Sequence, residues 1–160
     1  FELRQEVLDL ARASEFYEGL TTGLATLARY RRLTGEPDTA LSVAQEALQI
    51  ALEKNLPMNM VWAHVEIGLA CLEQGELSGA LTHTEGALSL LPQAHQAWIG
   101  IEQVHWAHAK VLQALKRPEE AILHQDKAED CLMRKAALIP DPQQRQRYCT
   151  FTRSLLLDQI

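Results

Sequence analysis

Small and aliphatic residues recur along the chain at one fixed shift, and this pattern predicts how the chain is organised. Aliphatic residues follow the shift at Leu41, Leu81 and Ile122. Three sets of small residues repeat with the same two offsets, 40 positions and then 41: Ala28, Gly68 and Ala109; Ala40, Ala80 and Ala121; Ala47, Ala87 and Ala128. Independent sets that share both offsets indicate a real internal repeat, which is typical of helical solenoids.

Turn residues divide each repeat into two predicted helices. A glycine can end one helix in a left-handed conformation, and a proline suits the first turn of the next. Lys116 stands where the first two units have glycine, so it is strained there or its turn differs. The equivalent turn segments are Gly35-Glu36-Pro37, Gly75-Glu76-Leu77 and Lys116-Arg117-Pro118. With further breaks at Pro57 and Pro92, we expect helices near residues 3–14, 18–34, 37–54, 58–74, 77–91, 95–115, 118–137 and 142–158.

The predicted domain organisation is one all-α solenoid over residues 1–160. Residues 5–8 line up with residues 45–48 at the offset of 40, so residues 1–16 are expected to be the second helix of a preceding unit. Because a solenoid unit contacts mainly its neighbours, an array can be divided between units, and we expect this chain to be the closing stretch of a longer one. The three full repeats and the final capping helix are expected at residues 17–56, 57–93, 94–138 and 139–160.

Composition and charge narrow the function classes. The chain is 47% hydrophobic and 22% charged but only 6% aromatic, so it is globular and its core must come from alanine and aliphatic residues. A net charge of -6 argues against nucleic-acid binding, which needs a basic face. No apolar run approaches the ~20 residues of a membrane span. Three cysteines without CxxC spacing indicate reduced thiols in a reducing, cytoplasmic compartment.

The repeat resembles the tetratricopeptide family, in which small residues occupy fixed positions and a glycine lies between the two helices. The second unit matches best, with Gly68, Gly75, Ala80, Ala87 and Pro92. The units are longer than the standard repeat of about 34 residues, and they lack the family's usual aromatic residues. Those positions carry Arg31, Cys71, Leu112, Ala44, Thr84 and Gln125. The resemblance implies a right-handed α-α superhelix of about eight antiparallel helices that binds proteins.

Long units of this kind are similar to those in large bacterial ATP-dependent transcription activators of the maltose-regulator type and in related signalling ATPases. A second segment points the same way. Ile139-Pro140-Asp141-Pro142, followed by Arg145 and Tyr148, resembles the segment that closes the repeat array in such regulators. Asp141 can cap a helix that Pro142 opens. The resemblance implies an interaction or sensor region of a larger bacterial regulator.

The same resemblance implies which residues bind a protein or peptide partner, because the first helix of each unit lines the concave groove in such solenoids. The mapped positions are Arg29 and Arg32 in the first unit; Trp62, Val65, Glu66, Leu69 and Glu73 in the second; and Gln103, Trp106, Lys110 and Gln113 in the third. Trp62 and Trp106 are the strongest candidates, since tryptophan is a typical binding anchor. The alternative is that each tryptophan packs between helices.

No catalytic, metal or cofactor site is expected. His105 and His108 are three residues apart on one predicted helix, but a metal needs further ligands, and Glu102 is the only local candidate. Cys71 falls on a repeat core position with no adjacent base, so we expect it to pack as a small apolar residue. Since no nucleophile, base or glycine-rich phosphate loop emerges, no enzyme is indicated.

Two other functions stay open. The final predicted helix has apolar residues on most of its faces: Leu155, Leu156, Leu157 and Ile160. It therefore either caps the third repeat or pairs with a second chain as a homodimer. Binding of a small-molecule inducer is the other alternative.

Two groups of basic residues occur in the sequence, and each is either a solvated helix face or an anchor for an acidic partner. They are Arg29, Arg31 and Arg32, and Arg145, Arg147 and Arg153.

Overall fold

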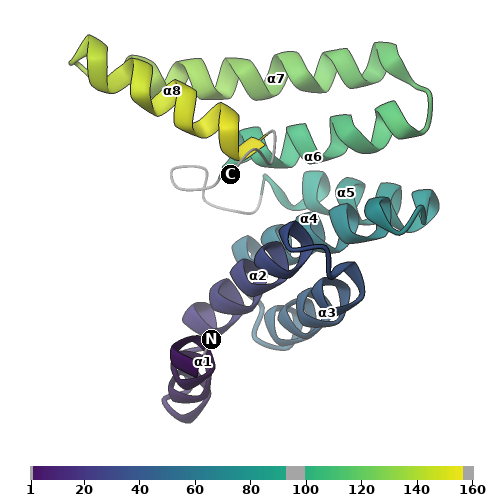
Figure 1. Ribbon diagram of the computed structural model, residues 1–160, viewed down its shortest axis with the longest axis vertical. Coiled ribbons are helices and arrows are strands. Elements are labelled where there is room, and N and C mark those ends of the chain that lie inside the picture. The colour runs from purple at the N-terminus through teal and green to yellow at the C-terminus, as the bar shows by residue number, and fades with distance from the viewer. Residues whose placement is uncertain (1, 93–99, 157–160) are drawn as a thin grey trace. The chain divides into compact units, whose positions relative to one another are not determined.

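The structure, a computed structural model, describes residues 2–92 and 100–156 (Figure 1). Every regular element in these ranges is an α-helix, which confirms the predicted all-α class. The described helices are α1 (Glu2–Ala13), α2 (Tyr17–Leu33), α3 (Pro37–Glu53), α4 (Pro57–Glu73), α5 (Leu77–Leu90), α6 (Ile101–Ala114), α7 (Pro118–Ala137) and α8 (Pro142–Leu156). None of these helices is both long and apolar enough to cross a membrane.

The helix ends that the described residues test agree with the predicted ones to within one residue, with one exception at the start of α6. Gly100 is predicted to lie inside a helix, but it precedes α6 as its N-cap residue. The prediction was wrong at this position because glycine is a poor interior helix residue and is tolerated well at an N-cap. Residues 95–99 and 157–158 of two predicted helices lie outside the described residues.

Turns of one kind join α1 to α2, α2 to α3, α3 to α4, α4 to α5 and α6 to α7. The N–H of a residue with positive φ donates to the carbonyl three residues earlier, and the next N–H donates to the carbonyl five residues earlier. In one such turn these bonds run from Gly75 to Leu72 (3.1 Å) and from Glu76 to Cys71 (2.8 Å). This Schellman arrangement satisfies the last carbonyls of the helix that each such turn follows. In the described part of the chain the positive-φ residues are Glu15 (54°), Gly35 (79°), Asn55 (53°), Gly75 (80°) and Lys116 (58°).

The predicted glycine caps at Gly35 and Gly75 are therefore confirmed. Lys116 adopts the same turn and not a different one. A lysine in this conformation is strained because its Cβ crowds the backbone, whereas Asn55 tolerates it better. After the turn, a proline at the start of α3, α4 and α7 supplies a φ that already suits a helix.

Two compact units make up the chain, Phe1–Ile99 and Gly100–Ile160. In the first unit each helix from α1 to α5 packs on the next, and α2 also packs on α4. Its core includes Leu8 of α1 with Leu20 and Leu24 of α2. In the second unit α6 and α7 form a hairpin and α8 packs on both, as Figure 1 shows. The assignment of residues 1–160 to a single domain, with its repeat boundaries, stays a prediction.

The recurring small residues lie where helices approach one another closely. Ala40, Ala80 and Ala121 each retain 1% of their surface or less. A Cβ built on Gly68 of α4 would lie 2.7 Å from Cγ2 of Thr84 on α5. No larger side chain fits such a contact unless its neighbour moves. Cys71, expected to pack as an apolar residue, is buried, and burial raises the pKa of its thiol.

Replacing Gly75 by alanine tests the turn geometry. No atom lies within 4 Å of a Cβ built on Gly75, so the cost comes from forcing a side chain into positive φ. We expect Gly75→Ala to lower the free energy of unfolding by about 1 kcal/mol, measured by urea denaturation. The matched control is Lys116→Ala at the equivalent turn, where a strained side chain is already present, and it should change stability by less than about 0.5 kcal/mol. Equal losses from the two variants would contradict this account.

Candidate partner-binding site

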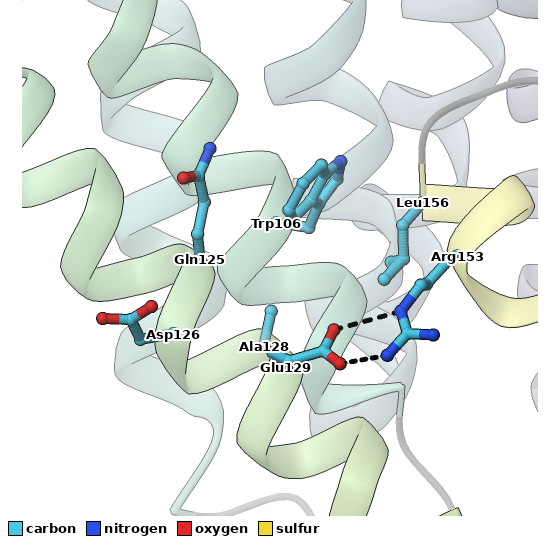
Figure 2. A pocket seen from close by; sticks show the side chains of 7 residues that line it. All are labelled: Trp106, Gln125, Asp126, Ala128, Glu129, Arg153 and Leu156. Carbon is cyan, nitrogen blue, oxygen red and sulfur yellow. Dashed lines mark hydrogen bonds and ion pairs between the residues drawn. The ribbon is translucent and has the colours of Figure 1, made fainter. Parts of the chain in front are cut away.

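A pocket with a volume of about 260 Å³ lies within the second unit, among α6, α7 and α8. Trp106 of α6, Ala128 of α7 and Leu156 of α8 give it apolar surface. The polar residues of its lining are Gln125, Asp126, Glu129 and Arg153 (Figure 2). The site is therefore a partly open, mainly apolar pocket with groups of both charges in its lining.

The helix α8 forms one side of this pocket because one of its faces is buried. Cys149, Thr152 and Leu156 retain little exposed surface and are spaced three and four residues apart, which places them on one face of a helix. Ala128 is one of the recurring small residues, and its burial allows α7 to lie close to α6. The pocket thus depends on the last hairpin of the repeat pattern and on a helix that follows it.

An ion pair joins α8 to α7 at the edge of the pocket. Figure 2 shows Arg153 reaching from α8 to the carboxylate of Glu129, and its Nε lies 3.3 Å from Oε2. The carboxylate raises the pKa of Arg153. Both side chains are about half exposed, at 46% and 47%, so such a pair contributes only about 0–1 kcal/mol. Most of the attachment of α8 must come from its buried face.

Trp106 and Asp126 are lining residues with polar groups that the described part of the chain leaves unpaired. Trp106 is half-buried, and its indole Nε1 is buried with no hydrogen-bond partner among the described residues. A buried donor without an acceptor costs about 1–3 kcal/mol. Asp126 is exposed and forms no ion pair within residues 2–92 and 100–156, whereas Glu129 is paired with Arg153. The lining therefore carries one net negative charge.

In the first unit, three predicted partner-binding residues bind one another. Arg32 of α2 donates to Glu66 of α4 (Nε to Oε2, 3.3 Å) and to Glu73 of α4 (Nη1 to Oε1, 2.8 Å). The side chains of Arg32 and Glu66 are only 3% and 6% exposed, so this ion pair lies inside the unit and joins α2 to α4. Arg31, from the same basic group of the sequence, pairs with Glu36 at 2.8 Å.

The remaining predicted groove residues divide between interior and surface. Val65 and Leu69 of α4 are buried, so they contribute packing to the described structure. Gln113 is exposed. The partly exposed ones are Arg29, Trp62, Gln103, Trp106 and Lys110. Of the eleven predicted residues, Trp106 is the one that lines the pocket, and the sequence interpretation missed Gln125 and Asp126 because it assigned binding to the first helix of each repeat.

The segment before α8 is held by local hydrogen bonds. Oδ1 of Asp141 accepts a hydrogen bond from the backbone N–H of Gln144 at 2.7 Å, which confirms the predicted helix cap. Arg145 donates from Nε and Nη2 to the carbonyl of Ile139 at 3.0 and 2.9 Å. Arg145, which follows the Ile-Pro-Asp-Pro segment, therefore fixes the turn that leads into α8.

Histidines meet across helices in both units. Nδ1 of His64 (α4) lies 3.0 Å from Nδ1 of His83 (α5), and Nδ1 of His105 (α6) lies 3.0 Å from Nδ1 of His124 (α7). The ring centroid of His108 lies 4.6 Å from that of His124. Burial, with a smaller effect of the neighbouring histidine, lowers the pKa of His64, His105 and His108 to about 4. These imidazoles are therefore neutral near pH 7.

Comparisons with known proteins agree on the fold. No protein-family model matches the sequence, and no curated protein matches it. Among solved structures, the chain is similar to the TPR domain of Arabidopsis FLU, with a TM-score of 0.63 and 19% identity over 73% of this chain and 98% of that domain. It is also similar to BtubC (BKLC) from P. vanneervenii, with a TM-score of 0.66 and 16% identity over 88% of this chain and 58% of that one. At these identities the likeness shows the fold, and it confirms helical repeats of the tetratricopeptide kind.

Removing one member of the buried ion pair tests whether it holds the first unit together. Arg32→Ala removes the positive charge beside the buried carboxylate of Glu66, so we expect the free energy of unfolding to fall by about 3 kcal/mol. Arg117→Ala is the control, because it breaks an exposed pair with Glu120, and should cost less than about 1 kcal/mol. Urea denaturation measures both. The account fails if Arg32→Ala lowers the free energy of unfolding by no more than Arg117→Ala does.

The histidine pairs predict a specific loss of stability in weak acid. Their pKa values are lowered in the folded state, so the contribution of each neutral pair is full above the unfolded pKa of about 6.5 and is lost as pH falls towards about 4. Urea midpoints should decline already between about pH 6.5 and about pH 5, where carboxylates are still ionised. A His64→Gln, His105→Gln variant should show a flatter profile in that window. An unchanged slope in the variant would assign the loss to other groups.

Proposed function

We propose that this chain is a protein-interaction scaffold and that the pocket of its second unit receives one side chain of a protein or peptide partner. The helical-repeat fold supports this class, because stacked helix pairs present extended surfaces to partners. One observation supports the site in particular: Trp106 and Leu156 offer apolar surface in a pocket whose lining also includes the carboxylate-bearing Asp126. Tryptophan is among the residues that most often dominate binding energy at interfaces.

The size of the pocket favours a side chain over a free small molecule. Sites for drug-sized ligands usually have volumes of about 300–1,000 Å³ and enclose most of the ligand. This pocket has about 260 Å³ and is partly open. A small-molecule inducer, the alternative raised by the sequence, would therefore have to be compact and would remain partly exposed. A peptide residue can leave its backbone outside and insert only its side chain.

The chemistry of the pocket favours lysine or arginine as that side chain. Both carry an apolar stem that packs along hydrophobic surface while the charged end stays near water. The ring of Trp106 can also attract a cation through its face. Asp126 supplies the anionic acceptor, since Glu129 is already paired with Arg153. The net charge of -6 favours approach of basic partners as well.

In each unit taken by itself, the exposed positions on the first helix of a repeat are also proposed to contact a partner. Arg29 and Trp62 occupy such positions in the first unit, and Gln103, Lys110 and Gln113 occupy them in the second. Each keeps at least part of its surface accessible. The buried ion pair and the buried aliphatic residues of α4 would support these positions from inside without touching a partner.

The wider setting is proposed from the sequence resemblance. The long repeat units and the segment Ile139–Pro142 favour a place within a larger bacterial transcription regulator or signalling ATPase of the cytoplasm. In that setting the repeats would receive a signal from another protein. The acidic charge of the chain makes direct contact with nucleic acid or with an anionic membrane unfavourable.

Self-association through α8 is the alternative that one observation favours. Phe151 of α8 is 63% exposed, and a second copy of the chain would cover such an aromatic side chain favourably. Leu156, counted among the apolar residues of the final helix, is instead buried. Light scattering over a concentration series separates the two proposals: a monomer at every concentration excludes the dimer, and a dimer that Phe151→Ser dissociates supports it.

Short random peptides displayed on phage test the proposed pocket. We expect selection on this chain to enrich peptides with a lysine or arginine beside apolar residues. Asp126→Asn should weaken binding of the selected peptides about tenfold, because it removes the charge that a cationic side chain meets. Asp130→Asn is the matched control, since Asp130 is exposed on the same helix and does not line the pocket. Selected peptides that bind both variants equally well, and bind Trp106→Leu as tightly as the original chain, would refute the pocket.

A further inference from the structure

Each unit contains a histidine pair built in the same way. The α4–α5 pair is His64 with His83, and the α6–α7 pair is His105 with His124. In both pairs the Nδ1 atoms are 3.0 Å apart and the partners are 19 residues apart in sequence. Both pairs have ring centroids 5.1 Å apart, with tilts of 42° and 55°. Because the two pairs are related by the repeat offset of 41, they occupy equivalent positions of two repeats.

The short contact fixes the protonation of each pair. Two Nδ1 atoms at this distance share one proton, so one ring donates and the other accepts. A second proton would set two N–H donors against each other. Burial, which lowers the pKa of both His83 and His124, likewise favours the uncharged rings. Each pair thus presents two neutral imidazoles, which is the form that binds metal ions.

We propose that each histidine pair binds one divalent transition-metal ion, Ni²⁺ or Cu²⁺, through its two Nδ1 atoms. When the ion replaces the shared proton, that proton moves to Nε2 of the same ring, so the ring stays neutral and no net proton is released. Water completes the coordination, because no group of three histidine, cysteine, aspartate or glutamate side chains in residues 2–92 and 100–156 is arranged to hold a metal ion.

The hydrogen-bond spacing of the nitrogens is also compatible with one metal geometry. With a metal–nitrogen distance of about 2.1 Å, two ligands at a right angle lie about 3.0 Å apart, whereas two tetrahedral ligands lie about 3.4 Å apart. The observed 3.0 Å matches the right angle. Tetragonal and square-planar geometry is the preference of Cu²⁺ and Ni²⁺, while Zn²⁺ prefers a tetrahedron. We therefore expect Zn²⁺ to bind more weakly than Ni²⁺.

Neighbouring groups distinguish the two sites. At the α4–α5 pair, a Cβ on Gly86 would lie 3.0 Å from Cε1 of His64, so the glycine leaves room for the ring. At the α6–α7 pair, the positive charge of Lys127 acts on both rings and also opposes a cation. Glu120 acts in the opposite sense, but it is paired with Arg117. The α4–α5 pair is therefore expected to fill first.

Calorimetric titration with NiCl₂ tests this proposal on untagged, chelator-treated protein. We expect two ions per chain. His83→Gln and His124→Gln should each leave one ion, and the double variant should lose at least about tenfold in affinity at both sites. His108→Gln is the control, because it removes a nearby ring that belongs to neither pair, and should keep two ions. A chain that binds Ni²⁺ more weakly than about 1 mM, or a double variant that binds as the original does, would overturn the proposal.

A second measurement, on the original chain, tests the proposed metal sites even if the glutamine variants do not fold. Addition of excess Zn²⁺, which is diamagnetic, to the original chain should shift the ring ¹⁵N resonances at Nδ1 of His64 and His83 and leave their Nε2 atoms protonated. Shifts confined to Nε2, or to histidines outside the two pairs, would contradict it. This outcome is independent of peptide binding, so the metal sites and the proposed partner pocket stand or fall separately.

Discussion

Close approach of helix backbones at alanine and glycine is the constraint on which the rest of this chain depends. The recurring small residues are almost completely buried, and Gly68 leaves no room for a methyl group beside Thr84. Larger residues at these positions would separate the helices of each hairpin. Because the helices are close, side chains that face each other across them are brought into direct contact, as in the α4–α5 and α6–α7 histidine pairs.

The same need to bury an apolar face applies to the hairpin of α6 and α7. A helical repeat buries its apolar face against a neighbouring element. In the second unit that element is α8, which follows the capped turn at Asp141 and covers part of α6 and α7. Its fit leaves a pocket that Trp106 and Asp126 line. The proposed partner site thus depends on the packing of α8, and not on the repeat pattern alone.

Sequence periodicity was sufficient for the helices and for the positions of small residues, because both follow from local propensity and from one repeated spacing. It missed Glu15 and Asn55 as left-handed turns, although asparagine is a recognised residue for this conformation. The ion pair of Arg32 and Glu66 could not be read from the pattern, since a charge at a groove position looks solvated until the partner 34 residues away is placed.

The pocket and the histidine pairs were also not predicted from the sequence, because each joins residues of different helices. His105 was compared with His108 on its own helix, whereas its contact is His124, which lies 19 residues later on the next helix. The repeat offset could have revealed the pairs, because both members recur at 41. The pocket was less accessible to sequence reasoning. Its third wall is α8, which lies outside the repeat, so no periodicity specifies where Arg153 and Leu156 will be.

The most direct test of the central claim is the response of tryptophan indole resonances to a bound peptide. In ¹H–¹⁵N spectra, titration with a peptide that contains a lysine or arginine should move the indole signal of Trp106 together with the backbone amide of Asp126, and leave that of Trp62 in place. Trp62 and Trp106 are both half-buried, so exposure alone does not favour one over the other. A response confined to Trp62 would place the partner on the first unit and contradict the account.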